Sequence, residues 1–219
     1  MNPTPCKLCL SHGCVATVRN TGRDFIHCPA CGLVFVPEAQ WLSVDEERAR
    51  YAHHENTAAN AGYVKFLGEV ADVVCGLSEP AAHILDFGSG ENAVLTALLR
   101  KRGRDCVAYD PLYELGANAL GEKYDAIVAC EVIEHLRGLR KEIVRLAKCL
   151  RPGGHVVVRT QCYPSVAELS SWWYTRDATH INFFSAGTLA IAAKLCGLAH
   201  RATEKADLFV WSSVRIDSH

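Results

Sequence analysis

Two pairs of closely spaced cysteines lie near the start of the chain. Cys6 and Cys9 form the first pair, and Cys28 and Cys31 form the second after a gap of eighteen residues. Two thiolates that are two residues apart can reach one ion from a tight turn, and two such turns complete a tetrahedral shell. The spacing therefore predicts a structural Zn²⁺ site with four cysteine ligands. Weaker candidates for a ligand are His12, Cys14 and His27.

A glycine-rich segment follows an apolar stretch in the middle of the chain. Asp86 lies within this stretch, at residues 82–87, and Gly88, Ser89 and Gly90 come directly after it. Glycine has no Cβ, so the backbone can approach a ligand at the carboxyl end of a strand. Asp110 ends the next apolar stretch twenty residues after Gly90, close to the interval at which α/β folds place a carboxylate on a ribose diol. The combination predicts a bound nucleoside.

Two glutamates and two histidines form a third group. Glu131, Glu134 and His135 follow the apolar residues 124–130, and His180 lies in a later polar segment. Positions three and four apart share a helix face, so the first three side chains are expected to converge. Two carboxylates with imidazoles suit Mg²⁺ or Mn²⁺. In the alternative without metal, Glu131 contacts a cofactor or substrate, Glu134 pairs locally, and neutral His135 or His180 is the general base.

The elements that must position these groups divide the chain into three parts. Residues 1–40 are expected to form a zinc-ribbon-like module with strands at 14–18, 24–27 and 33–36. So few residues cannot bury a sufficient core, so the metal would supply the missing stability. Residues 41–80 are expected to form a helical connector, and residues 81–219 the nucleoside-binding domain.

The connector has two interpretations. Ser43 and Glu46 match a capping box, which predicts a helix start, and an apolar stripe that includes Tyr63 predicts a second helix at 57–75. The polar residues 51–56 between them predict a bend. The two helices are either an amphipathic cover on the next domain or a lid through which Tyr51 and Tyr63 reach a ligand.

From residue 81 onward, strands alternate with helices, which is typical of a parallel sheet covered on both faces. Strands are expected at 82–87, 106–110, 123–130 and 155–160, helices at 93–101, 131–150 and 185–196, a turn at 151–154, and a final strand pair at 200–204 and 207–213. Only thirteen residues separate Asp110 from Tyr124. This interval is too short for a further helix and strand, so the sheet is expected to be one strand short.

Composition excludes several classes of protein. The net charge of −1 provides no global attraction for nucleic acid, and the basic clusters at 100–104 and 137–151 are expected to face solvent. No apolar run approaches the roughly 20 residues that span a bilayer, and residues 1–6 lack a secretory signal. We therefore expect a cytoplasmic protein, in which eleven cysteines bind metal or pack in a core.

Four segments in order resemble the class I methyltransferases that use S-adenosylmethionine. These are LDFGSG at 85–90, YDAIVACEVIEHL at 124–136, LRPGG at 150–154 and THINFFS at 179–185. The last one is similar to a bacterial subfamily in which several members carry an N-terminal zinc-binding segment. The resemblance covers about residues 81–214 and implies a Rossmann-like methyltransferase fold.

The resemblance also implies roles for particular residues. The methionine part of the cofactor would lie on Asp86, Gly88, Ser89 and Gly90, and its ribose on Asp110; further contacts would come from Tyr63, Cys130 and Glu131. The acid that commonly binds the adenine amine has no counterpart, so the connector helix is expected to close that pocket. The second metal group resembles that of small-RNA 2′-O-methyltransferases and also fits quinone-precursor O-methyltransferases.

We therefore expect methyl transfer to a small-molecule acceptor, with His135, His180 and Glu131 as the catalytic residues. Aromatic residues at 172–174 and 183–184 are either a wall for the acceptor or part of the core. One alternative is an RNA methyltransferase whose zinc ribbon contacts RNA, although the ribbon offers only Lys7, Arg19 and Arg23 as cations. Another is a non-catalytic, cofactor-binding interaction module. The oligomeric state has no signal in the sequence.

Overall fold

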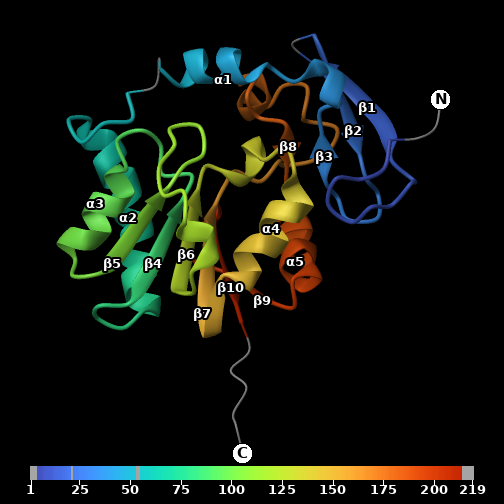
Figure 1. The fold of residues 1–219 in the computed structure, drawn as a ribbon. Coiled ribbons are helices and arrows are strands. Elements are labelled where there is room, and N and C mark those ends of the chain that lie inside the picture. Colours follow the sequence, from blue (N-terminus) through green and yellow to red (C-terminus); the bar gives the residue numbers. More distant parts are fainter. Residues whose placement is uncertain (1–3, 21, 53–54, 214–219) are drawn as a thin grey trace, which may run out of the picture.

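The computed structural model describes residues 4–20, 22–52 and 55–213. In this part of the chain the main sheet has six strands in the order β5-β4-β6-β7-β10-β9 (Figure 1). Their bounds are β4 His83–Phe87, β5 Asp105–Tyr109, β6 Tyr124–Cys130, β7 Leu150–Arg159, β9 Ala199–Ala202 and β10 Leu208–Ser212. Strands β5, β4, β6 and β7 are parallel, and β10 runs antiparallel to β7 and β9. The expected α/β fold class is confirmed.

Helices cover both faces of this sheet (Figure 1). One face carries α2 (Ala61–Leu77) and α3 (Val94–Lys101), and the other carries α4 (Leu139–Lys148) and α5 (Ala186–Leu195). Adjacent residues of a strand point to opposite faces. In β6, Ile127 therefore packs toward α4 and α5, whereas Val128 packs toward α2 and α3, and both are fully buried. Burial on both faces explains why these strands read as continuous apolar runs.

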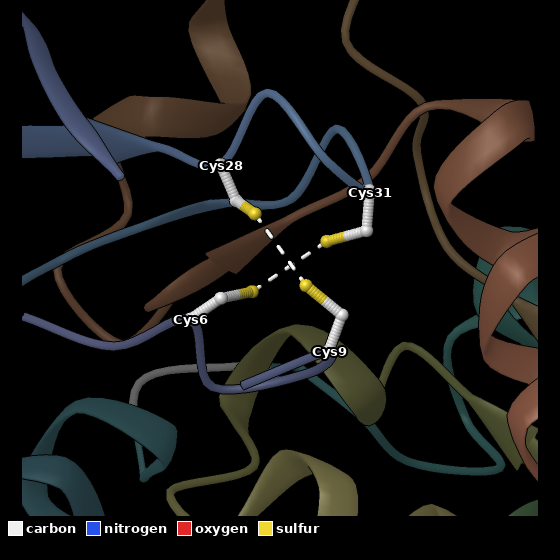
Figure 2. A group of neighbouring side chains, drawn as sticks. All are labelled: Cys6, Cys9, Cys28 and Cys31. Carbon is white, nitrogen blue, oxygen red and sulfur yellow. Dashed lines mark hydrogen bonds between the residues drawn. The ribbon is translucent and has the colours of Figure 1, made fainter. Parts of the chain in front are cut away.

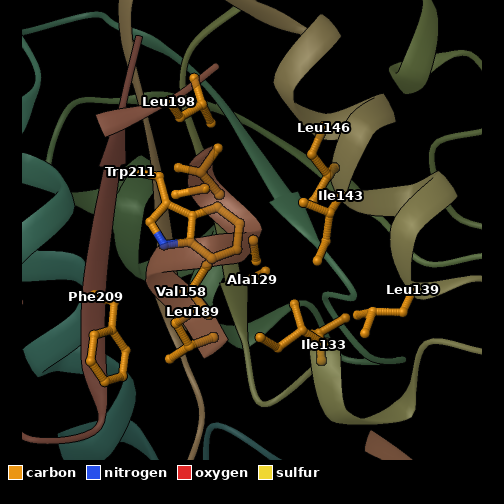
Figure 3. Close-up of a cluster of buried hydrophobic side chains, with 14 of the residues drawn as sticks. Ala129, Ile133, Leu139, Ile143, Leu146, Val158, Leu189, Leu198, Phe209 and Trp211 are labelled. Carbon is orange, nitrogen blue, oxygen red and sulfur yellow. The ribbon is translucent and has the colours of Figure 1, made fainter. Parts of the chain in front are cut away.

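The larger core lies between the sheet and the helices α4 and α5 (Figure 3). Ile143 and Leu146 of α4 and Leu189 of α5 pack there with Trp211 of β10. The indole of Trp211 is 1% exposed, and its Nε1 donates a hydrogen bond to His200 Nδ1 at 3.1 Å. This partner satisfies the one polar atom that the large side chain brings into the core.

Side-chain caps fix three of the helix starts. Ser43 and Glu46 form the expected capping box at the start of α1 (Val44–Tyr51). Ser185 forms a second box with Thr188 before α5. The connector's second helix was expected from residue 57, but α2 begins four residues later because the Asn60 side chain accepts the N–H of Tyr63.

The interval between β5 and β6 contains a turn and a short 3-10 helix, Ala119–Gly121, and no strand of the sheet in the described chain. Strand β5 is consequently an edge strand, and the expectation of a shortened sheet is confirmed. Residues 111–118 fold back onto the end of β5, where Asp110 bridges to Leu115. A Cβ on Gly116 would lie 2.3 Å from the carbonyl oxygen of Ala108, so this close return requires glycine.

Two local expectations are wrong. The segment after β6 is not a continuous helix: Glu131 has a φ of 54°, Ile133–His135 form a 3-10 turn, and α4 begins only at Leu139. The residues 151–154, expected as a turn, lie within β7. The register against β6 shifts there, and a Cβ on Gly154 would lie 2.9 Å from the carbonyl oxygen of Asp125.

A second, smaller sheet joins the N-terminal strands to a late segment of the chain. It contains β1 (Val15–Asn20), β2 (Arg23–His27), β3 (Val34–Phe35) and β8 (Asn182–Phe183), in that order. The three N-terminal strands match the expected ribbon, and β8 adds a fourth from the late segment (Figure 1). The boundaries at residues 40 and 80 stay predictions, but the N-terminal strands share a sheet and a core with residues of the third part.

No helix in the described part of the chain is both long and apolar enough to cross a membrane. The centre of the expected bend at 51–56 falls on residues 53–54, and the resemblance and the third part extend beyond residue 213. These positions, with residues 1–3 and 21, lie outside the described residues.

Candidate cofactor-binding and catalytic site

A cavity of about 880 Å³ opens at the carboxyl ends of the parallel strands. Its wall includes the glycine loop after β4, Tyr109 and Asp110 at the end of β5, and Cys130 and Glu131 at the end of β6. Helices α1 and α2 contribute the side chains of Tyr51 and Tyr63. Ligands of open α/β sheets bind at this edge, so the cavity is the candidate site.

The glycine loop owes its shape to positive φ angles and to a close neighbour. Gly88 and Gly90 have φ angles of 77° and 66°. A Cβ on Gly88 would lie 2.5 Å from Cγ2 of Val132, which is closer than any real side chain allows. The loop can therefore pass β6 only because residue 88 has no side chain.

Asp110 holds this loop in place. Its Oδ2 accepts the N–H of Gly90 at 2.9 Å, and its Oδ1 accepts the N–H of Leu112 at 2.9 Å. Burial raises the pKa of the Asp110 carboxyl, although these backbone hydrogen bonds oppose the shift. Each carboxylate oxygen accepts more than one hydrogen bond, so the side chain can still accept bonds from a diol in the cavity.

Asp86 is the one expected cofactor residue that does not line the cavity. Its side chain points beneath the loop, where its Oδ2 accepts the hydroxyl of Thr96 on α3 at 2.7 Å. Burial raises the pKa of Asp86 to about 6. In this structure the residue joins β4 to α3, and its expected contact with the methionine part stays a prediction.

A buried hydrogen-bonded cluster connects the two glutamates. The Tyr174 hydroxyl donates to Glu131 Oε2 at 3.0 Å and to Glu134 Oε1, and Thr160 Oγ1 donates to Glu134 Oε2 at 3.1 Å. Burial raises the pKa of Glu131 to about 7. Burial, together with the Glu131 carboxylate, raises the pKa of Glu134 well above its usual range. The phenol has only one proton to donate to the two carboxyl groups. Since burial raises the pKa of both carboxyls, one of them also holds a proton near neutral pH.

Glu131 differs from Glu134 in facing the cavity. Its Oε1 is buried and has no hydrogen-bond partner among the described residues. Its φ of 54° is uncommon for a residue with a side chain and costs on the order of 1–3 kcal/mol. A strained backbone and an unpartnered buried oxygen at a cavity wall indicate a group that is held ready for a ligand.

The two histidines lie side by side in the wall, with ring centroids 4.8 Å apart. Nδ1 of His180 donates to the carbonyl oxygen of Tyr174 at 2.8 Å, so Nε2 carries the lone pair of the neutral ring. Burial lowers the pKa of His180 to about 4. Nδ1 of His135 lies 2.9 Å from the Tyr51 hydroxyl and 3.1 Å from the carbonyl oxygen of Thr179. His180 is therefore a neutral base at physiological pH.

The expected divalent-cation site stays a prediction. Ligand atoms of Glu134, His135 and His180 lie within 4.8 Å of one another, but Glu131 does not join this group. Both oxygens of Glu134 already accept hydroxyl hydrogen bonds. One carboxylate and two imidazoles also provide fewer oxygen ligands than Mg²⁺ prefers. The donors present fit a hydrogen-bonded cluster better than a magnesium site.

The four cysteines of the N-terminal pairs converge (Figure 2). The Sγ atoms of Cys6 and Cys31 are 3.5 Å apart, those of Cys9 and Cys28 are 3.5 Å apart, and all four lie within 4.8 Å of one another. A tetrahedral Zn²⁺ with Zn–S bonds of about 2.3 Å separates its sulfurs by about 3.8 Å. The donors and their spacing therefore fit Zn²⁺. The alternative ligands His12, Cys14 and His27 are not part of the cluster.

Helix α1 contributes Val44, Glu47 and Tyr51 to the wall of the cavity, and Figure 1 shows it at the top of the view, between α2 and the N-terminal strands. It has no buried residue, and polar contacts attach it to the rest of the protein. Arg48 donates to the carbonyl oxygen of Leu112 at 3.0 Å, and Arg137 donates to Glu47 at 3.1 Å. Tyr51 and Tyr63 both line the cavity, while Val70 and Val74 of α2 are buried in the core. Helix α2 is therefore a cover on the sheet, and a lid role for the connector stays a prediction.

Of the two interpretations of the aromatic residues, a wall for the acceptor or part of the core, the structure supports the core. Trp172, Tyr174 and Phe183 pack in a core with the N-terminal strands, and none of them lines the cavity. Sequence reasoning missed the hydroxyl of Tyr174 as the link between the glutamates, and also Thr160. The one available signal was that a buried tyrosine needs a partner for its hydroxyl.

The sheet order, the glycine loop after the first parallel strand and the acid after the second define a Rossmann-like nucleoside-binding fold of the class I methyltransferase type. A family model described as a methyltransferase domain matches residues 51–202, which is more than half of the chain. The chain belongs to this family of S-adenosylmethionine-dependent methyltransferases.

Solved structures of methyltransferases share the fold. An O-methyltransferase family protein from Burkholderia thailandensis is 18% identical with a TM-score of 0.57, over 78% of this chain and 64% of that one. The 1,6-didemethyltoxoflavin-N1-methyltransferase of the same organism, with S-adenosylhomocysteine bound, is 13% identical with a TM-score of 0.53, over 91% of this chain and 99% of that one.

The N-methyltransferase NodS from Bradyrhizobium japonicum, also in complex with S-adenosylhomocysteine, is 15% identical with a TM-score of 0.54. The alignment covers 78% of this chain and 98% of that one. A search of curated proteins by sequence found no match. At these identities the likeness establishes the fold and leaves the acceptor open.

Proposed function

We propose that this protein transfers a methyl group from S-adenosylmethionine to a small-molecule acceptor. The observation that carries the proposal is that two kinds of residue line the cavity of about 880 Å³ at the carboxyl ends of the parallel strands. The glycine loop and Asp110 lie at one part of it, and Glu131, His135 and His180 lie at another. The groups proposed to bind the nucleoside and the proposed base thus line the same cavity.

The residues divide the work between binding and proton transfer. The backbone of Gly88–Gly90 and the Asp110 carboxylate would hold the nucleoside, with Asp110 accepting from its ribose hydroxyls. The unpartnered Oε1 of Glu131 would accept a hydrogen bond from a ligand group. Bound S-adenosylmethionine would supply a methyl group already activated on a sulfonium. Catalysis then requires mainly that this chain aligns the acceptor.

His180 would remove the proton that the acceptor loses. Its Nε2 has the lone pair, and burial keeps its pKa below physiological pH, so the ring is in the proton-accepting form. His135 lies against it and is oriented by Tyr51 and the carbonyl oxygen of Thr179. Helix α1 would exclude water from the cavity while the acceptor is bound.

Two observations support a small-molecule acceptor rather than RNA. A structural relative is described with the small molecule 1,6-didemethyltoxoflavin bound. The cations of the cysteine module are also engaged: Lys7 pairs with Glu38 at 2.7 Å, Arg19 lies 3.5 Å from Asp24, and Arg23 is buried. A module that grips nucleic acid needs cations that can reach phosphates.

The four-cysteine cluster is proposed to hold structural Zn²⁺. Three of its ligands, Cys6, Cys28 and Cys31, are almost fully buried. A closed shell of four thiolates leaves no position for a substrate. Metal content can be measured on the purified protein by mass spectrometry, where one zinc per chain supports the assignment and none overturns it.

The test of the function combines binding with labelling. The protein should bind S-adenosylhomocysteine in calorimetry, and should transfer tritium from methyl-labelled S-adenosylmethionine into the small-molecule fraction of a cell extract. A protein with Asp110→Ala should lose both properties. Label found only in RNA would overturn the small-molecule acceptor, and a wild-type protein that binds no S-adenosylhomocysteine would overturn the proposed function.

A further inference from the structure

Arg23 is a buried cation at the boundary between the cysteine module and the rest of the protein. The residue is 8% exposed. Its Nη1 donates to the carbonyl oxygens of Ala178 at 3.2 Å and His180 at 2.9 Å. Its Nη2 donates to those of Thr175 at 2.5 Å and Asp177 at 2.9 Å. Residues 175–180 therefore wrap around one guanidinium group.

This wrapped segment carries the proposed base, His180, into the cavity wall. His180 ends it, and Tyr174 immediately precedes it. Nδ1 of His180 bonds to the carbonyl oxygen of Tyr174, while the Tyr174 hydroxyl reaches Glu131 and Glu134. The carbonyl oxygen of Tyr174, which directly precedes the residues around Arg23, is thus the acceptor for the Nδ1–H of His180.

Strand β2 connects Arg23 to the cysteine cluster. Arg23 is the first residue of β2, and Cys28 directly follows the end of that strand. Cys31 leads through two residues into β3, which pairs with β8, and Val36 beyond it donates to the carbonyl oxygen of Ile181 at 3.0 Å. Strands β2 and β3, which flank the second cysteine pair, therefore both contact the segment around His180. Strand β2 does so through Arg23, and β3 does so through β8 and the bond to Ile181.

Further contacts join the cysteine module to the segment around residues 175–180. At the end of β1, Asn20 Nδ2 donates to Thr175 Oγ1 at 2.9 Å. The Tyr163 hydroxyl donates to the carbonyl oxygen of Gly32, within the second cysteine turn, at 2.6 Å. Phe25 of β2 packs on Phe183 with ring centroids 5.4 Å apart. These contacts are distributed over the whole length of the wrapped segment and its flanks.

We propose that the metal-bound module is the positioning element of the acceptor side of the site, and that Arg23 is its positioning residue. The cysteine cluster holds β2 and β3, Arg23 shapes residues 175–180, and this shape sets the His180 tautomer. The cofactor side, with Gly88, Gly90 and Asp110, is built on β4 and β5 and does not depend on this chain of contacts. This proposal rests on the proposed function only because the side of the site that contains His180 is named after the acceptor.

The test compares Arg23→Lys with Arg19→Lys. A lysine has one nitrogen and cannot bond to four carbonyls that are arranged around a planar fork, whereas Arg19 is an exposed side chain of the same module. In the Arg23 variant, amide hydrogen exchange of residues 174–183 should accelerate about tenfold or more. The ring ¹⁵N spectrum of His180 should lose its single Nδ1–H tautomer. The affinity for S-adenosylhomocysteine should stay within about twofold of wild type.

Removal of the metal from the wild-type protein by a chelator should produce the same changes in exchange and in the His180 spectrum. Unchanged exchange at 174–183 and an unchanged His180 tautomer, in Arg23→Lys or in the metal-free protein, would overturn the proposal. So would an Arg23 variant that loses cofactor affinity in parallel, since the effect would then be general. Exchange and the ring spectrum are measured without an acceptor, so they stay informative if the proposed methyl transfer itself proves wrong.

Discussion

Asp110 Oδ2 lies 2.9 Å from the backbone nitrogen of Gly90 and accepts its N–H. The acid at the end of β5 therefore shapes the loop after β4 in addition to facing the cavity. Sequence reasoning assigned these residues to two parts of one ligand. In the structure they are also partners of each other, so the two contributions to cofactor binding are coupled.

We expect Asp110→Asn to weaken S-adenosylhomocysteine binding by about 10- to 100-fold. The amide places N–H donors where the carboxylate has acceptors, so one of the bonds to Gly90 and Leu112 is lost, and such a bond to a charged group contributes about 1.5–3 kcal/mol. Calorimetry measures the affinity. Glu114→Gln, a neighbouring charge outside the cavity wall, is the control and should bind like wild type.

Gly88→Ala should abolish cofactor binding and lower stability. The new Cβ would lie 2.5 Å from the Val132 side chain at a φ of 77°, and strain of this kind costs on the order of 1–3 kcal/mol. Gly76→Ala is a matched control, because its Cβ meets nothing within 4 Å and lies in α2. That change should stabilise the helix by about 0.5–1 kcal/mol. Equal melting temperatures for the two variants would contradict the argument.

Local sequence signals identified the elements and half of the site. The capping box at Ser43, the apolar strands and the spacing of the cysteines depend on neighbours within a few residues, so the chain displays them directly. The direction of Asp86 could not be read in this way. Its partner Thr96 lies on another element, and the pattern of a buried strand does not reveal which polar side chain faces a helix.

Contacts between distant segments were beyond such reasoning. In the sequence, Arg23 is one of three cations of the ribbon, but its four acceptors lie about 150 residues later in the chain. Tyr174 was grouped with neighbouring aromatics, and its hydroxyl partners became visible only in the folded protein. Backbone carbonyls have no sequence signature, so a residue that binds them cannot be recognised from spacing.

Asp86 should make stability depend on pH. Burial raises the pKa of this carboxyl to about 6 from an ordinary value near 3.8, so the folded state binds the proton more tightly than the unfolded state does. The residue therefore costs stability as pH rises from about 4 to above 6, by an amount on the order of 3 kcal/mol. In chemical denaturation, Asp86→Asn should gain stability relative to wild type across this window. Parallel curves for the two proteins would contradict the assignment.

His180 should behave in the opposite direction. Its pKa is lowered by burial to about 4, so the unfolded state takes up a proton as pH falls through about 6.5 while the folded state does not. The free energy of unfolding that His180 contributes is therefore lost as pH falls from about 6.5 to about 4. His180→Gln should lack this loss. With an acceptor in hand, the same variant should slow methyl transfer by about 10²- to 10⁴-fold and leave S-adenosylhomocysteine affinity unchanged.

Helix α1 should respond to salt because ionic and polar contacts attach it. Arg137→Ala removes the bonds to Glu47 and to the carbonyl oxygen of Leu42. We expect S-adenosylhomocysteine to dissociate about 2- to 5-fold faster in stopped flow, since exposed and half-exposed pairs contribute up to about 1 kcal/mol. High salt should accelerate dissociation from the wild type toward the same rate. Arg201→Ala, on the exposed strand β9, should change neither value.

Strand β3 completes its pairing only with β8, where Val34 lies opposite Phe183. During synthesis on the ribosome, at about 5–20 residues per second, roughly 7–30 s pass between the appearance of these two residues. In that interval the emerging cysteine turns can capture their ion and β2 can pair with β3, but the other edge of β3 has no neighbour. The first strands therefore complete their pairing only after residues 182–183 have been synthesised, and a truncated chain that stops before residue 182 would leave this edge exposed to other chains.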